Sequence, residues 1–130
     1  MIGLDTNVVV RYLTQDGPQY PAAVKLIESL SAEEPGFITL IVLVEIVWVL
    51  ESCYGSDKND IFRVVDALLR TKNLMLERKD IVSHALRRFI AGNADFADCL
   101  IERCGHAEEC RFTVTFDRKA AKGAGMRLLE

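Results

Sequence analysis

The 130-residue sequence lacks the features that mark several large classes of protein. It has no uninterrupted apolar run of about 20 residues, the length that a membrane-spanning helix requires, because Thr39 and Glu45 interrupt the run from Phe37 to Leu50. The first residues, MIGLDTN, contain no basic segment, so we expect no secretory signal and a cytoplasmic location. Repeats and low-complexity tracts are also missing, which favours a single domain over residues 1–130.

Common catalytic signatures are absent as well. No GxxxxGK[ST], GxGxxG or GxSxG motif occurs, and neither of the two histidines lies in a recognisable triad pattern. Cys99, Cys104, His106 and Cys110 are close in sequence, but they include no CxxC pair, and Cys99 and Cys104 would fall on different sides of a helix. We therefore expect reduced thiols rather than disulfides or a zinc site.

Strong positive charge is lacking too. The net charge of −3 combines an acidic half, residues 1–60 with 3 basic and 9 acidic side chains, and a mildly basic half, residues 61–130 with 13 basic and 10 acidic side chains. This distribution is not typical of a protein that binds nucleic acid through phosphate contacts alone. A nucleic-acid partner would need the help of a cation.

Periodicity and turn residues predict alternating strands and helices. We expect strands at 1–5, 36–39, 74–77, 112–116 and, at an edge, 126–129. Helices are expected from Thr6, over 18–30, from Leu40 to a stop at Gly55, over 57–71, from Lys79 to a stop at Gly92, over 96–107 and from Asp117. Such alternation indicates an α/β protein with a mostly parallel sheet and helices on both faces. Ligands then bind beyond the carboxyl ends of the strands.

Acidic residues occur at positions that suit a metal site. Asp5 and Asp117 end predicted strands, whereas Glu45 and Asp98 lie in predicted helices among apolar neighbours. No Lys or Arg lies within four residues of Glu45, so a buried Glu45 would need a cation or a proton. Asp95 lies one helical turn before Asp98, where capping of the helix and direct ligation both remain open.

These carboxylates predict a hydrolytic chemistry. Several carboxylates brought together cannot all stay ionised unless a cation neutralises them, and an all-oxygen set favours Mg²⁺ or Mn²⁺. Such an ion can activate a water to attack a phosphodiester. One alternative is a phosphatase with Asp5 as nucleophile, although Asn7 stands where a second acid is needed. Another is a non-catalytic module that binds RNA or protein, with the acids acting as helix caps.

Four segments, taken in order, resemble a known family. "IGLDTNVVVRYL", "LVEIVWVLE", "ADFADCLI" and "TVTFDRKAAK" span nearly the whole chain and are similar to PIN-domain ribonucleases of the VapC toxin type. The resemblance implies a three-layer α/β/α fold and an Mg²⁺- or Mn²⁺-dependent endoribonuclease. It also implies RNA as substrate, a cognate antitoxin protein as inhibitor and a homodimer. Carried over by motif position, the acidic quartet is Asp5, Glu45, Asp98 and Asp117, supported by Thr6, Asn7, Asp95 and Thr115.

Overall fold

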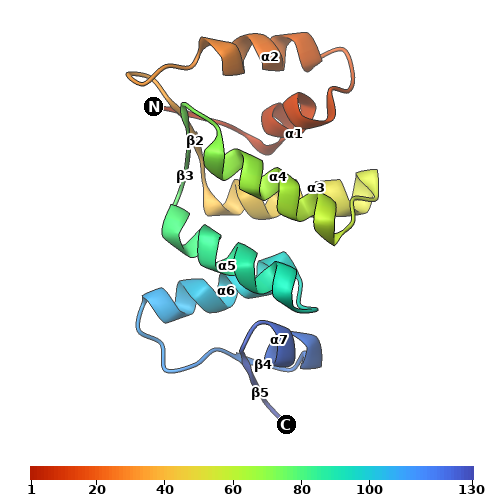
Figure 1. The fold of residues 1–130 in the computed structure, drawn as a ribbon, viewed down its shortest axis with the longest axis vertical. Coiled ribbons are helices and arrows are strands. Elements are labelled where there is room, and N and C mark those ends of the chain that lie inside the picture. Colours follow the sequence, from red (N-terminus) through yellow and green to blue (C-terminus); the bar gives the residue numbers. More distant parts are fainter. The chain divides into compact units, whose positions relative to one another are not determined.

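The computed structural model describes residues 1–130, which form two compact units, Met1–Glu77 and Arg78–Glu130. The first unit contains three strands and four helices, and the second contains three helices and two strands (Figure 1). No helix is long and apolar enough to cross a membrane.

The first unit is built on a parallel sheet of three strands. Its strands are β1 (Ile2–Gly3), β2 (Gly36–Ile38) and β3 (Leu74–Leu76), in the order β1-β2-β3. Helices α1 (Thr6–Thr14) and α2 (Tyr20–Ser29) connect β1 to β2, and α3 (Leu40–Tyr54) and α4 (Lys58–Arg70) connect β2 to β3 (Figure 1). Helix α1 packs against both α2 and α3. β1 and β2 are therefore each followed by a helical crossover to the next strand, as expected for a parallel sheet.

One face of this sheet is buried. Gly36 pairs with Leu74 and Ile38 with Leu76, and all four are buried, whereas Met75 between them is 51% exposed. A Cβ atom on Gly36 would lie 2.9 Å from side-chain carbons of both Leu30 and Leu74. Glycine at this position therefore allows leucine side chains to pack directly over the backbone of β2.

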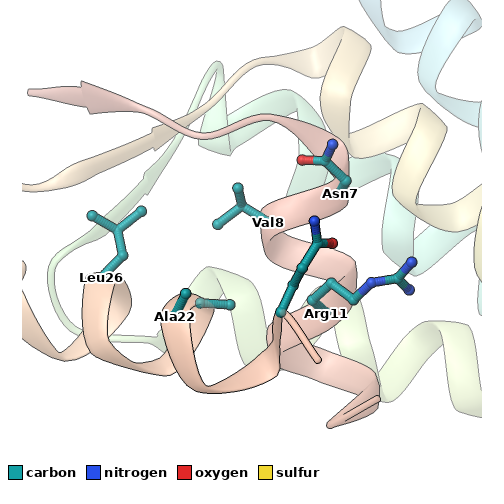
Figure 2. Close-up of a pocket in the computed structure, with 7 residues that line it drawn as sticks. Asn7, Val8, Arg11, Ala22 and Leu26 are labelled. Carbon is teal, nitrogen blue, oxygen red and sulfur yellow. The ribbon is translucent and has the colours of Figure 1, made fainter. Parts of the chain in front are cut away.

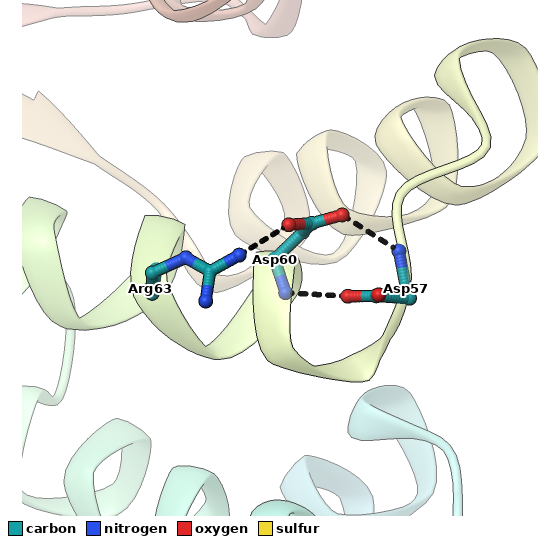
Figure 3. A network of polar contacts seen from close by, with 3 residues as sticks. All are labelled: Asp57, Asp60 and Arg63. Carbon is teal, nitrogen blue, oxygen red and sulfur yellow. Dashed lines mark hydrogen bonds and ion pairs between the residues drawn. The ribbon is translucent and has the colours of Figure 1, made fainter.

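Local signals set the helix ends. Helix α3 ends at Gly55, which has a positive φ of 63° that glycine adopts without strain. Helix α4 begins with a reciprocal capping box, in which Asp57 Oδ1 accepts from Asp60 N at 2.8 Å and Asp60 Oδ2 accepts from Asp57 N at 3.1 Å (Figure 3). The backbone hydrogen bond from Asp57, and the neighbouring Arg63, lower the pKa of Asp60.

The second unit pairs two helices and a small sheet. Helices α5 (Lys79–Ala91) and α6 (Phe96–Ala107) pack together, and the rings of Phe89 and Phe96 meet edge to face with centroids 5.8 Å apart. Strand β4 (Val114–Thr115) pairs in parallel with β5 (Arg127–Leu128), and α7 (Arg118–Gly123) connects them.

The strands and helices predicted from the sequence are all present, and every strand pair is parallel, as predicted. Three details differ. The strands form two sheets, one in each unit. The strand predicted over 1–5 is reduced to Ile2–Gly3, and the strand predicted over 112–116 is reduced to Val114–Thr115. Phe112 lies outside the strand, and its ring packs against guanidinium groups, with Arg127 Cζ at 3.7 Å from the ring centroid.

Candidate active site

Asp5 and Glu45 are linked through Thr6 in the first unit. Asp5 follows β1 and caps α1, its Oδ1 accepting from Thr6 N at 2.7 Å. The hydroxyl of Thr6 donates to Glu45 Oε1 at 2.7 Å, across 39 positions in sequence. Thr6 therefore positions both carboxylates at the carboxyl end of β1, where a parallel sheet typically places its ligands.

The expectation that Glu45 is buried is wrong. Glu45 is exposed, whereas Leu43, Ile46 and Val47 on the same helix are buried. The nearby large residues Ile41 and Trp48 are 76% and 63% exposed, so Glu45 lies on the solvent face of α3. The helix is apolar on all sides, and its sequence therefore does not indicate which side faces the core.

A further acid at this strand edge, Glu77, was not predicted as a site residue. Glu77 follows β3, and its Oε1 accepts from Leu40 N at 2.8 Å, at the start of α3. This bond satisfies a backbone N–H that the helix leaves without a partner. Its place directly after the strand "LML" was the signal available in the sequence. Glu77 holds the first turn of the helix that carries Glu45.

Asn7 lines a pocket between α1 and α2. The pocket has a volume of about 290 Å³, and Figure 2 shows Asn7, Val8 and Arg11 projecting from α1, with Ala22 and Leu26 on α2. The Nη1 of Arg11 donates to the Tyr54 hydroxyl at 3.3 Å, whereas its buried Nε has no hydrogen-bond partner. Asn7 itself is exposed.

In the second unit, Asp117 is held in a tight turn. It follows β4 and caps α7, its Oδ1 accepting from Lys119 N at 2.8 Å and from Ala120 N at 3.4 Å. The Thr115 hydroxyl accepts from Asp117 N at 3.0 Å. Thr115 thus fixes the backbone of the turn, and the second oxygen of Asp117 makes no hydrogen bond within the protein.

Asp98 is half-buried and lies in a negative environment. Burial raises its pKa, and the negative charges of Asp95 and Asp117 raise it further. Asp95 occupies the N-cap position of α6, yet its exposed side chain makes no capping hydrogen bond. The structure therefore does not support capping of α6 by the Asp95 side chain. The negative charge of Asp95 instead contributes to the raised pKa of Asp98.

The donor atoms are suited to a hard divalent cation. Asp5, Glu45 and Asp117 each use one carboxylate oxygen within the protein and leave the other without a partner. The raised pKa of Asp98 indicates a site where a nearby positive charge would favour the ionised form. No group of three or more His, Cys, Asp or Glu side chains in the structure has a geometry that could hold a metal ion.

The cysteines and histidines are spread over different environments. Cys99 is buried in the core, Cys53 and Cys110 are exposed, and Cys104 is intermediate. His84 and His106 line a separate pocket of about 300 Å³ with Arg78 and Arg103. None of these residues is among the carboxylates described above.

Comparison with known proteins agrees with the resemblance in the sequence. The chain is similar to a VapC ribonuclease of Aquifex aeolicus (strain VF5), with 27% identity over 120 residues that cover 92% of this chain and 89% of that protein. The PIN domain family model matches residues 2–125, which confirms the predicted α/β class with an α/β/α PIN-like organisation. Since that match covers nearly the whole sequence, the chain belongs to the PIN domain family.

Proposed function

We propose that this protein is a metal-dependent endoribonuclease and the toxin of a toxin–antitoxin pair. The observation that carries the proposal is the half-buried Asp98, whose pKa is raised by burial and by the charges of Asp95 and Asp117. A helix carboxylate kept among other carboxylates is costly unless a cation offsets it. The PIN family match and the similarity to a VapC ribonuclease support RNA as the substrate.

We assign the metal-binding role to the acidic quartet Asp5, Glu45, Asp98 and Asp117. Carboxylate oxygens bind Mg²⁺ or Mn²⁺ in preference to softer metals. Asp5, Glu45 and Asp117 each have one carboxylate oxygen without a protein partner. The pKa of Asp98 is raised, and a bound cation would lower it and so favour the ionised form that binds metal. A bound ion would lower the pKa of a water that attacks phosphorus and stabilise the charge that develops on the leaving oxygen.

The side chains of this chain orient that chemistry. Thr6 holds Glu45 through its hydroxyl, and the amides of Lys119 and Ala120 hold Asp117, so both carboxylates are restricted before substrate arrives. Such preorganisation lowers the entropic cost of reaching the transition state. In the hydrolysis, the water oxygen would bond to phosphorus and give up one proton to solvent, while the bond from phosphorus to one ribose oxygen breaks. That oxygen would take up a proton from solvent and leave as a hydroxyl.

The family relationship also motivates proposals about partners and location. We assign to this protein a cognate antitoxin that inhibits it, a homodimeric state and a cytoplasmic site of action, where cellular RNA is available. Analytical ultracentrifugation of the purified chain tests the dimer, and a monomer at micromolar concentration would contradict it. Co-purification with the product of an adjacent small gene tests the antitoxin.

Cleavage of a mixed pool of structured RNAs tests the function. The purified protein is assayed with Mg²⁺, with Mn²⁺ and with EDTA, beside an Asp98→Asn variant. Asp66→Asn is a matched control, because Asp66 is on α4 and forms only an ion pair with Arg70 at 3.0 Å. We expect cleavage that needs metal, is lost in Asp98→Asn and is retained in Asp66→Asn. Cleavage that persists in EDTA and in Asp98→Asn would contradict the proposed mechanism.

A further inference from the structure

A pocket on the second unit carries unpaired positive charge. It lies between the C-terminal end of α5 and helix α7 and has a volume of about 700 Å³, within the range of about 300–1,000 Å³ typical of small-molecule sites. We call it the α7 pocket; its lining residues are Gly92, Asn93, Arg118, Lys119, Lys122 and Gly123.

The cations of the α7 pocket are not used by the protein itself. Arg118, Lys119 and Lys122 are exposed and form no ion pair. Elsewhere in the same unit, Arg103 pairs with Glu102 at 2.7 Å and Arg78 with Asp80 at 3.3 Å. Three uncompensated cations around one hollow repel one another and attract an anion.

The walls of the pocket are held by tight packing. Arg88 Nε donates to the carbonyl of Gly123 at 2.9 Å, which ties α5 to the end of α7. A Cβ atom on Gly123 would lie 2.7 Å from the backbone nitrogen of Ala94, so only glycine permits this approach. The end of α7 is therefore fixed against the loop before α6, so this wall of the pocket is held in place by the protein's own contacts.

The pocket is directly linked in sequence to the candidate acidic site. Arg118 follows Asp117, and Asn93 comes two residues before Asp95. A polyanion whose scissile phosphodiester reaches these acids is repelled by them, so positive charge beside them is needed to hold its neighbouring phosphates. An acidic peptide would have no reason to approach the same carboxylates. The charge pattern therefore favours an RNA strand over a protein segment.

We propose that the α7 pocket binds a phosphate of the RNA strand next to the one that is cleaved. This inference rests on the proposed ribonuclease function. Arg118, Lys119 and Lys122 are then positioning residues, which contact the backbone of single-stranded RNA without reading its bases. The substrate must extend beyond the scissile bond by at least one further phosphate.

RNA binding measured without cleavage tests this assignment. Fluorescence anisotropy of a labelled single-stranded RNA is recorded with the full-length Asp98→Asn variant in Mg²⁺ at several salt concentrations. Lys119→Gln with Lys122→Gln is added to that background. The matched control carries Lys79→Gln with Arg87→Gln, two exposed cations of α5 that do not line the pocket. Both pairs remove the same charge.

We expect the plot of log Kd against log salt to lose about 0.7 units of slope in the pocket pair, since the pocket holds one phosphate and each phosphate contact to a single strand contributes about 0.7. The control pair should keep the slope of its parent. In the cleavage-competent protein, the pocket pair should raise KM with kcat little changed. An unchanged slope in the pocket pair, or an equal loss in the control pair, would overturn the assignment.

Two further outcomes separate this inference from the proposed function. If the parent variant and the wild-type protein neither bind nor cut any RNA, the ribonuclease proposal fails, and this inference fails with it. A second outcome is that the salt dependence of RNA binding is unchanged in the pocket pair, whereas binding of a labelled polyglutamate peptide is lost in the pocket pair and kept in the control pair. An acidic protein segment would then be the occupant of the pocket. That result would overturn the RNA assignment and leave the ribonuclease proposal intact.

Discussion

The hydroxyl of Thr6 donates a hydrogen bond to Glu45 Oε1 at 2.7 Å, and the backbone N–H of the same residue donates to Asp5 Oδ1 at 2.7 Å. One residue thus connects an acid at the end of β1 with an acid in the middle of α3. We expect Thr6→Val to lower kcat/KM for RNA cleavage about tenfold, since a hydrogen bond to a charged group contributes about 1.5 kcal/mol. Thr6→Ser keeps the hydroxyl and should retain most of the activity. Equal losses in the two variants would argue against this role.

Glu45→Gln should weaken Mg²⁺ binding while the fold stays intact. The side chain is exposed, so its replacement disturbs no buried contact, whereas a neutral amide is a poorer ligand for a hard cation. Isothermal titration with Mg²⁺ gives the affinity, and circular dichroism checks the fold. Glu51→Gln on the same helix is a control for the loss of one exposed acid. Wild-type affinity in Glu45→Gln would exclude a ligand role.

Asp98→Asn should stabilise the metal-free protein and abolish cleavage. Burial and the charges of Asp95 and Asp117 raise the pKa of Asp98, so its ionised form destabilises the native state. A raised carboxyl pKa means that stability falls as the pH rises from the ordinary aspartate range through the raised value. The variant should therefore melt a few degrees higher at pH 7 and lose this part of the pH dependence. A lower melting temperature at pH 7 would contradict the cause assigned here.

Mg²⁺ should raise the melting temperature of the wild-type protein. An ion that binds only the native state adds about 1.4 kcal/mol of stability at ten times its Kd, which corresponds to a few degrees for a domain of this size. The effect should be smaller in Asp98→Asn, where one proposed ligand is lost. Differential scanning fluorimetry in Mg²⁺ and in EDTA measures both. A melting temperature that does not respond to millimolar Mg²⁺ would count against the proposed metal site.

Gly123→Ala should destabilise the second unit. The added Cβ would lie 2.7 Å from the Ala94 backbone nitrogen, and relief of that contact by backbone movement costs about 1–3 kcal/mol. Gly3→Ala is the control, because nothing lies within 4 Å of a Cβ at that position. Urea denaturation followed by circular dichroism gives both free energies of unfolding. Equal stability of the two variants would show that the end of α7 can move away from Ala94.

The order and type of the elements were predictable because they depend on local chemistry. Gly55 ends α3 by adopting a positive φ, and Asp57 begins α4 through its capping box, as turn and cap preferences predict. Asp5 and Asp117 were placed at strand ends by the same local reasoning, and in the structure each of them follows a strand after one intervening residue and caps a helix. These features need only a few neighbouring residues, so the sequence contains them in full.

Other features depended on contacts between distant segments. The exposure of Glu45 follows from which side of an apolar helix packs inward, and its hydrogen bond to Thr6 spans 39 positions in sequence. The α7 pocket was also hidden, because the balance of charge along the chain is mild and only folding places Gly92 and Asn93 beside the cations of α7.

The sequence by itself determined the order of strands, helices and turns, the identity of the candidate acidic residues and the family to which the chain belongs. Only the tertiary structure decided which side chains are exposed, which carboxylate oxygens are left without partners and where positive charge is uncompensated. The physical reason is that backbone propensity and capping are local, whereas burial and electrostatic pairing depend on segments that are far apart in the chain.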